Sequence, residues 1–138
     1  MLIWRFHVRG MLVDTSAWID FFAGQTIPAL EEALAAQIVI LSPVVVAELV
    51  SGAINPRERR AISELVLELP IHATPREHWI ATGNLRRELR AQGLSVSTPD
   101  AHIAQCALDR RALLLSRDSI FSRISDVVPL MLVREDMT

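Results

Sequence analysis

The chain has 138 residues, of which 51% are hydrophobic and 22% charged, with a formal net charge of -2. This composition is too apolar for a disordered chain and fits one compact domain. All 14 basic residues are arginine, and the absence of lysine excludes a P-loop, a Schiff-base enzyme and lysine-dependent phosphoaspartate domains. An all-arginine surface is compatible with nucleic acid, although codon bias in a GC-rich gene gives the same composition.

Short apolar runs alternate with amphipathic segments along the chain, without an internal repeat or linker. In chain order we expect a strand at 11–14, helices at 17–23 and 28–37, a strand at 38–41, helices at 42–52 and 55–69, a strand at 71–73, helices at 75–93 and 98–111, a strand at 113–115, a helix at 119–124 and a strand at 130–133. Ser42 with Pro43 is an N-cap and first-turn pair, and Thr74 with Glu77 is expected to form a capping box. Strands that alternate with helices predict an α/β fold whose parallel sheet is covered on both faces.

Three features bear on the compartment of the protein. The longest apolar stretch, 38–47, is interrupted by Ser42 and Pro43 and falls short of the roughly 20 residues that a bilayer span needs. Residues 1–10 carry charged side chains among apolar ones and lack the cleavage site of a signal peptide. The single cysteine, Cys106, excludes an internal disulfide and a cysteine-based zinc site, so metal would bind through oxygen or histidine. We therefore expect a cytoplasmic protein without a membrane helix.

Four acidic residues are candidates for a functional site. Asp14 ends the first expected strand, Asp100 lies in the first turn of a helix, and Asp118 follows the strand at 113–115 by three residues. In an open parallel sheet, ligands bind at the carboxyl ends of the strands, near the point where strand order reverses, so these carboxylates should converge. Glu48 is the fourth candidate because it lies in the apolar segment 44–50, where burying it unpaired would be costly.

Each of these acids also has a purely structural interpretation. Asp14 can cap a helix, Asp100 can complement a helix dipole and Asp118 can begin a turn, roles worth about 0.5–2 kcal/mol. Glu48 can occupy an exposed helix position or pair with an arginine. Together, however, four carboxylates would repel one another unless a divalent cation neutralised them, and hard oxygen ligands select Mg2+ or Mn2+. The group as a whole predicts a metal site.

The motifs around these acids are Met11-Leu-Val-Asp14-Thr-Ser16, Ala47-Glu48-Leu49, Pro99-Asp100-Ala-His-Ile103-Ala104, and Leu115-Ser-Arg-Asp118 with Phe121. In this order and spacing they resemble the PIN-domain ribonucleases, especially the VapC-type toxins of bacterial toxin–antitoxin modules. The resemblance implies a parallel sheet sandwiched between helices, metal-dependent RNA cleavage, and Asp14, Glu48 and Asp100 as the first three acids of the site. Asp118 most resembles the fourth acid, and Ile120 stands where many relatives carry another acid.

The resemblance also implies an organisation and partners for the chain. It covers residues 11–133, which leaves 1–10 as an N-terminal extension outside the fold and 134–138 as a C-terminal tail. It implies a homodimer and a small antitoxin whose C-terminal segment covers the acidic groove.

The corresponding chemical hypothesis is hydrolysis of RNA by water activated on one or two Mg2+ or Mn2+ ions, which leaves a 5′-phosphate and a 3′-hydroxyl. Thr15, Ser16 and Ser116 could contact a metal-bound water or a phosphate, and Arg117 a phosphate, although capping and turn chemistry also explains the hydroxyls. His102 is expected on the helix surface and Cys106 in the core, without a chemical role. The competing hypothesis is a non-catalytic PIN-like or other parallel-sheet module that binds metal or nucleic acid.

Overall fold

A four-stranded parallel sheet forms the centre of the computed structural model, which describes residues 9–134. Its strands are β1 (Met11–Val13), β2 (Val39–Ile40), β3 (Leu113–Leu115) and β4 (Met131–Leu132). They lie side by side in the order β2-β1-β3-β4, and every pairing is parallel. The predicted parallel sheet is therefore confirmed, with its strand order reversing between β1 and β3.

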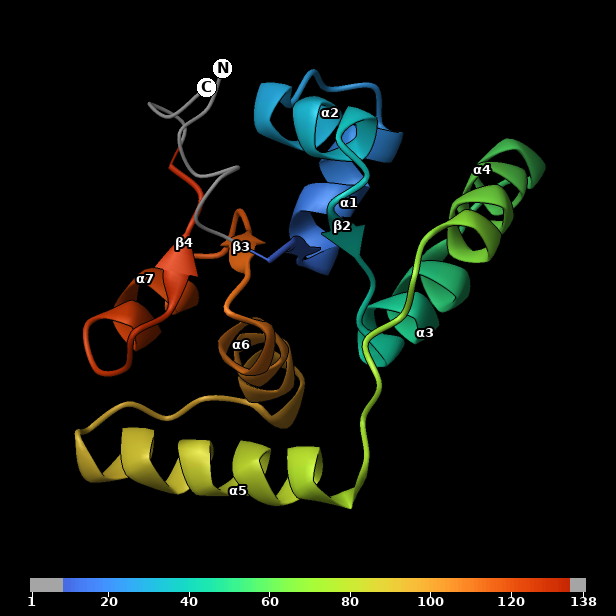
Figure 1. Cartoon of the computed structure of the whole chain (residues 1–138). Helices are drawn as coiled ribbons and strands as arrows, with labels where there is room; N and C mark the ends of the chain where they lie inside the picture. The colour runs from blue at the N-terminus through green and yellow to red at the C-terminus, as the bar shows by residue number, and fades with distance from the viewer. Residues whose placement is uncertain (1–8, 135–138) are drawn as a thin grey trace.

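Helices cover both faces of this sheet, as predicted. They are α1 (Thr15–Phe22), α2 (Pro28–Ala35), α3 (Pro43–Gly52), α4 (Pro56–Glu68), α5 (Arg76–Ala91), α6 (Thr98–Arg110) and α7 (Ile120–Ser125). Figure 1 shows the sheet between α6 on one side and α1 and α2 on the other, with α5 outside α6. Among the helices of residues 9–134, none is long and apolar enough to cross a bilayer.

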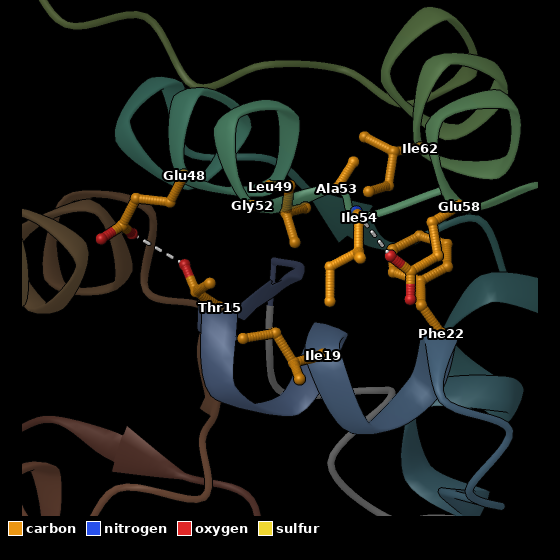
Figure 2. Close-up of a pocket in the computed structure, with 10 residues that line it drawn as sticks. All are labelled: Thr15, Ile19, Phe22, Glu48, Leu49, Gly52, Ala53, Ile54, Glu58 and Ile62. Atoms are coloured by element: carbon orange, nitrogen blue, oxygen red, sulfur yellow. Dashed lines mark hydrogen bonds between the residues drawn. The ribbon is translucent and has the colours of Figure 1, made fainter. Parts of the chain in front are cut away.

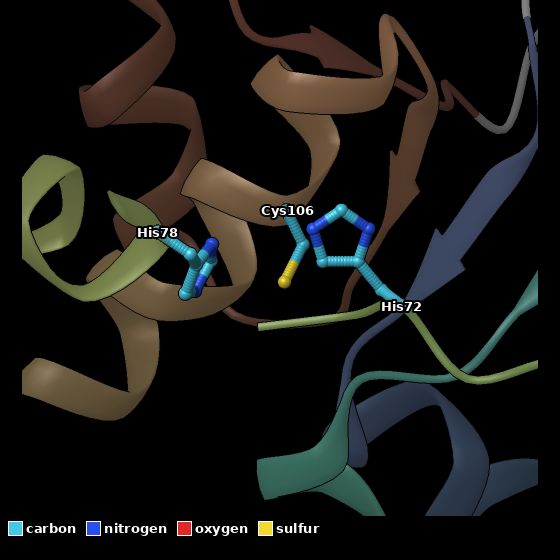
Figure 3. Close-up of side chains that lie close together, drawn as sticks. All are labelled: His72, His78 and Cys106. Atoms are coloured by element: carbon cyan, nitrogen blue, oxygen red, sulfur yellow. The ribbon is translucent and has the colours of Figure 1, made fainter. Parts of the chain in front are cut away.

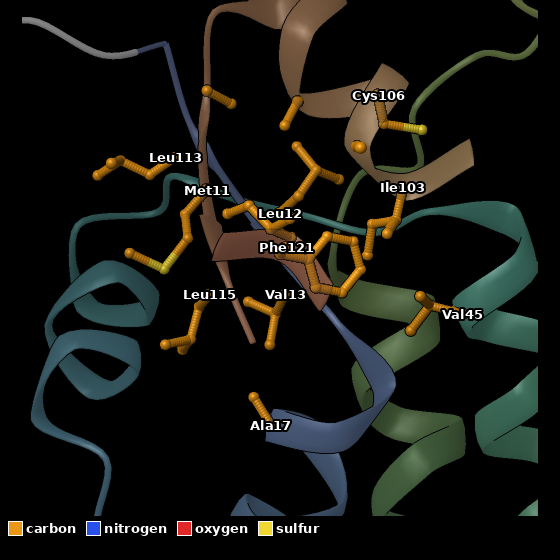
Figure 4. Packing of buried hydrophobic residues seen from close by; sticks show 14 of the residues in the cluster. Met11, Leu12, Val13, Ala17, Val45, Ile103, Cys106, Leu113, Leu115 and Phe121 are labelled. Atoms are coloured by element: carbon orange, nitrogen blue, oxygen red, sulfur yellow. The ribbon is translucent and has the colours of Figure 1, made fainter. Parts of the chain in front are cut away.

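The two central strands are buried along their whole length. All three residues of β1 and all three of β3 are inaccessible or nearly so, which is typical of parallel strands covered on both faces. Figure 4 shows their side chains packed with Ile103 and Cys106 of α6, Val45 of α3 and Phe121 of α7. This packing fixes where β1 and β3 end, and so where the residues that follow them lie.

Proline and a polar N-cap residue begin the helices that carry two of the candidate acids. The Ser42 hydroxyl accepts a hydrogen bond from Val45 N at 3.3 Å at the start of α3. At the start of α6, the Ser97 hydroxyl accepts one from Asp100 N at 3.2 Å. Both hydroxyls satisfy amide groups that lack a partner inside the helix. The helix starts predicted from Ser42-Pro43 and Thr98-Pro99 are confirmed.

Two local predictions between α4 and α5 are wrong. Residues 71–73 form no strand, because only a single parallel bridge joins Ile71 to Leu41. The capping box of Thr74 and Glu77 is also not formed: α5 has Pro75 as its N-cap residue and no side-chain cap. Pro75 is extended, with φ -68° and ψ 175°, so the helix begins one residue later than the capping box requires.

The N-terminal edge of the described chain is attached to the sheet. Gly10 O accepts a hydrogen bond from Leu113 N at 3.0 Å, and Arg9 N donates to Arg111 O at 3.3 Å. Gly10 has a φ of +137°, and a Cβ there would lie 2.5 Å from Ile40 Cδ1, so glycine is required. The expected extension, apart from residues 9 and 10, and the expected tail, apart from residue 134, lie outside the described residues.

Candidate active site

The candidate site lies where β1 and β3 end side by side. Asp14 follows β1 directly, and its backbone N–H donates to Leu115 O, at the end of β3, at 2.8 Å. Ser116 follows β3 in the same way. Because strand order reverses between these two strands, the edge has the open position at which parallel sheets bind ligands.

Asp14 is held by two hydroxyl groups. Its Oδ2 accepts hydrogen bonds from Ser16 Oγ at 2.8 Å and from Ser116 Oγ at 2.9 Å. Although Asp14 occupies the N-cap position of α1, its side chain makes no capping hydrogen bond. The helix-capping interpretation therefore does not account for this carboxylate, whose orientation is set by the two serines.

The same hydroxyls also fix the loop that follows β3. Ser16 Oγ accepts from Arg117 N at 3.0 Å, and Ser116 Oγ accepts from Asp118 N at 2.9 Å. Each serine thus joins the Asp14 carboxylate to the backbone of this loop. The sequence suggested Ser16 and Ser116 as contacts to substrate. In the structure their hydroxyls hold the Asp14 carboxylate and the backbone of the loop that carries Asp118.

Glu48 lies on an exposed part of α3, not in the apolar interior. The buried face of α3 is formed by Val45 and Leu49, so Glu48 projects beside it toward α1. There its Oε1 accepts a hydrogen bond from Thr15 Oγ1 at 2.7 Å (Figure 2). The exposed-helix alternative is confirmed, and Thr15 nevertheless directs this carboxylate toward the end of β1.

Asp100 lies within electrostatic reach of the other three acids. Burial raises the pKa of its carboxyl above the ordinary value, and the negative charges of Asp14, Asp118 and Glu48 raise it further. A hydrogen bond with Ser97 opposes this shift. The fold therefore brings the four sequence-predicted acids into one electrostatic environment.

Asp118 lies at the exposed side of this group. Its Oδ1 accepts a hydrogen bond from Ile120 N at 3.0 Å, so the turn-forming role considered from the sequence is present. Ile120 is half-buried at the start of α7 and supplies no carboxylate. Asp118 is thus both a turn residue and one of the charges acting on Asp100.

Arg117 is engaged with an acid of α1. Its Nε lies 3.3 Å from Asp20 Oδ2, and both side chains are about one-third exposed. An exposed ion pair of this kind contributes only about 0–1 kcal/mol. Asp20 was not among the residues predicted from the sequence.

A family model of the PIN domain matches residues 11–127. The chain belongs to the PIN-domain family. Ribonuclease VapC11 of Mycobacterium tuberculosis strain H37Rv is 30% identical over 128 residues, which cover 87% of this chain and 95% of that protein. Within the PIN-domain family, the chain therefore groups with the VapC type, as its motifs indicated.

Solved structures show the same PIN-domain fold. DNA-bound VapBC from Salmonella typhimurium matches with a TM-score of 0.72 at 20% identity, covering 91% of this chain and 98% of that one. VapBC-1 from nontypeable Haemophilus influenzae gives a TM-score of 0.71 at 24% identity, with the same coverage of both chains. At these identities the likeness concerns the fold, and it confirms the predicted sheet sandwiched between helices.

A second polar cluster of this PIN domain was missed from the sequence. His102 was expected on the surface but is fully buried, in contact with His78 of α5. A signal was available, because His102 and Cys106 are four residues apart and so lie on one face of α6. Cys106 is buried as predicted, and burial raises its thiol pKa to about 12.

Proposed function

We propose that this PIN-domain chain hydrolyses RNA with the help of a divalent metal ion, as the toxin of a toxin–antitoxin module. The observation that carries the proposal is that the fold brings four carboxylates together, because Asp14 follows β1, Asp118 lies in the loop after β3, and the charges of both act with Glu48 of α3 on Asp100 of α6. The 30% identical relative, named a ribonuclease, supports the choice of RNA as substrate.

The donor set fits Mg2+ or Mn2+. The four acids, Asp14, Glu48, Asp100 and Asp118, offer only hard carboxylate oxygens. The repulsion that the other three charges exert on Asp100 is a cost that a bound cation would remove. These four residues would hold the ion. When bound, such an ion lowers the pKa of water and stabilises negative charge on phosphate oxygens.

The protein's own contribution is to orient these acids. Ser16 and Ser116 fix Asp14, and Thr15 fixes Glu48, each through a hydroxyl that donates to the carboxylate. Hydrolysis in which water attacks the phosphorus and the 3′-oxygen leaves would give a 5′-phosphate and a 3′-hydroxyl, without a side chain as covalent nucleophile. A non-catalytic module is the weaker alternative, because the 30% identical relative is named a ribonuclease.

Cleavage of mixed RNA by the purified chain, with and without added Mn2+ or Mg2+, tests the proposal. Asp100→Asn keeps the size of the side chain and removes the charge, so we expect cleavage to fall by orders of magnitude in a folded protein. Asp126→Asn is the matched control, because Asp126 is exposed and is not among the charges acting on Asp100. Wild-type cleavage rates in Asp100→Asn, or unchanged cleavage in excess chelator, would contradict the proposal.

An apolar pocket adjoins the acids and suits an antitoxin segment. It has a volume of about 200 Å3 and lies between α1, α3 and the start of α4 (Figure 2). Ile19 and Ile54 line it and are 57% and 83% exposed, while Glu48 and Thr15 form its end toward the acids. We propose that the cognate antitoxin places apolar side chains in this pocket and a basic side chain near the carboxylates.

A homodimer and a cytoplasmic location complete the proposal. Exposed apolar side chains at Leu67, Ile71, Trp79 and Ile80 provide surface that a second copy could cover. Light scattering of the purified chain measures its oligomeric state directly, and a monomer at micromolar concentration would contradict the homodimer.

A further inference from the structure

Three of the four histidines of the chain gather with its single cysteine between α5 and α6. His72 precedes α5, His78 lies on α5, and His102 and Cys106 lie on α6. All four are buried, and Figure 3 shows the Cys106 sulfur between the imidazole rings of His72 and His78. The proposed nuclease function uses none of these groups.

We propose that His72, His78 and Cys106 form a binding site for Zn2+, separate from the acidic site. This differs from the expectation from the sequence, which excluded cysteine as a zinc ligand because the chain has a single thiol. One ligand atom of each residue lies within 4.8 Å of those of the other two. Tetrahedral zinc, with bonds of about 2.0–2.1 Å to nitrogen and 2.3 Å to sulfur, spaces its ligand atoms by roughly 3.4–3.6 Å. The side chains therefore need to close by only about 1 Å around the ion.

Asp109 is placed to supply the fourth ligand. Its Oδ2 lies 3.3 Å from His78 Nδ1 and 3.9 Å from His72 Nε2. Asp109 is about one-third exposed and follows Cys106 on α6, so it forms the solvent side of the cluster. A thiolate and a carboxylate together would balance the two positive charges of the ion.

A buried chain of hydrogen bonds holds the Nε2 side of the His78 ring. His78 Nε2 lies 2.7 Å from His102 Nδ1, and His102 Nε2 lies 2.5 Å from Ser42 Oγ. These hydrogen bonds can form with the donors pointing either way along the chain, because each ring nitrogen can donate or accept. When His78 Nδ1 binds a metal, Nε2–H can donate to His102, which in turn donates to Ser42. Such outer partners orient metal-binding histidines.

The two pKa shifts in the cluster act in opposite directions: the shift of His72 favours metal binding, whereas the raised thiol pKa of Cys106 opposes formation of the thiolate. Burial, followed by the charges of Arg110 and His78, lowers the pKa of His72, which favours the neutral imidazole that binds metals. The Cys106 thiol is protonated in the free protein, and its proton would leave to solvent as the Zn–S bond forms.

One existing contact must open. Arg110 Nη1 lies 3.3 Å from His72 Nδ1, which would carry the proton once Nε2 binds zinc. Arg110 borders an open hollow of about 510 Å3 together with Arg9, Asp109 and Arg111. The guanidinium therefore has room to turn away from His72.

Titration of the full-length, metal-free protein with Co2+, a spectroscopic substitute for Zn2+, tests the proposal. We expect one equivalent to give the near-ultraviolet charge-transfer band of a thiolate–Co2+ bond, and excess Zn2+ to remove it. Only Cys106 can produce this band, so binding of Co2+ at the acids does not contribute. Asp100→Asn, which alters the acidic site, should leave the band and its midpoint unchanged.

Variants in the cluster complete the test. Cys106→Ser should abolish the band, and His72→Asn, at a position 8% exposed and so less damaging to the core, should weaken Co2+ binding at least about tenfold. No thiolate band in the wild-type protein at saturating Co2+ would overturn the proposal. Unchanged affinity in His72→Asn would overturn it as well. RNA cleavage with Mg2+ is measured separately, so either site can fail without the other.

Discussion

Asp14 depends on hydroxyl groups from two distant parts of the chain. Ser16 is two residues away in sequence and Ser116 is 102 residues away, yet both donate to the same oxygen. Hydrogen bonds to a charged group contribute about 1.5–3 kcal/mol, so each serine has a measurable share in holding the carboxylate. These two hydrogen bonds connect α1 and the loop after β3 through Asp14, a proposed metal ligand.

Ser116→Ala removes the hydrogen bond that crosses from β3 to β1. We expect metal affinity or kcat/KM for RNA to fall about 10–100-fold, the usual cost of losing an outer partner of a metal ligand. Ser122→Ala, at an exposed serine of α7, is the matched control and should leave both quantities unchanged. Equal activity of the two variants would show that Asp14 does not depend on Ser116.

His102 makes stability depend on pH. Burial lowers its pKa from 6.5 to about 4, with smaller effects of His78 and His72, so the folded state holds the neutral ring while the unfolded state takes up a proton. Its stabilising contribution is complete above pH 6.5 and is lost as pH falls toward 4, with about 2 kcal/mol lost between pH 7 and pH 5.

Urea unfolding at these two pH values checks this expectation. His102→Asn removes the titrating ring, so the loss of unfolding free energy on acidification should be smaller in the variant than in the wild-type protein. Other titrating groups contribute equally to the loss of unfolding free energy in the two proteins, so the difference between the two losses reports on His102 alone. An identical pH dependence in both proteins would contradict a buried, neutral His102.

Among the elements, those marked by strong local signals were predictable from the sequence. The start and end of α3 follow from Ser42-Pro43 and Gly52, and β3 follows from an uninterrupted apolar run between polar segments. Asp14 and Asp118 were placed correctly after strands, because a parallel sheet puts the residues that follow its strands on one edge.

Elements and burial that depend on tertiary contacts were not predictable in this way. Residues 71–73 have the composition of a short strand, but Leu41 offers them only a single bridge at the end of β2. His102 is polar, and only the packing of α5 on α6 buries it: the Trp79 ring stacks on it with centroids 4.9 Å apart. The sequence of α5 or of α6 taken alone therefore does not predict that His102 is buried.

The pair formed by α1 and the α3–α4 turn is the element predicted to bind the antitoxin. Ile54→Asp places a charge at an 83% exposed position of the apolar pocket, so it should weaken antitoxin binding at least about tenfold without disturbing the core. Met131→Asp, at a 38% exposed position of β4 outside both the pocket and the proposed dimer surface, is the control. Calorimetry with the cognate antitoxin measures both, and equal affinities would place the antitoxin elsewhere.

For the molecule as a whole, the reversal of strand order between β1 and β3 is what assembles the site. It places Asp14 and the loop with Asp118 side by side, and α3 and α6 bring Glu48 and Asp100 to the same edge. Four like charges at one edge oppose folding, and a cation that binds only the folded state removes this opposition. Stability and the proposed activity should therefore depend on the same ion.

The most direct measurement is the melting of the metal-free protein across a Mn2+ titration, for the wild-type chain and Asp100→Asn. At 100 times the dissociation constant, bound Mn2+ should add about 2.7 kcal/mol to the unfolding free energy of the wild-type protein. Asp100→Asn should remain folded within about 1 kcal/mol of the metal-free wild type and gain far less at the same Mn2+ concentration. A wild-type melting temperature that does not change with saturating Mn2+ would contradict a metal site formed by these four acids.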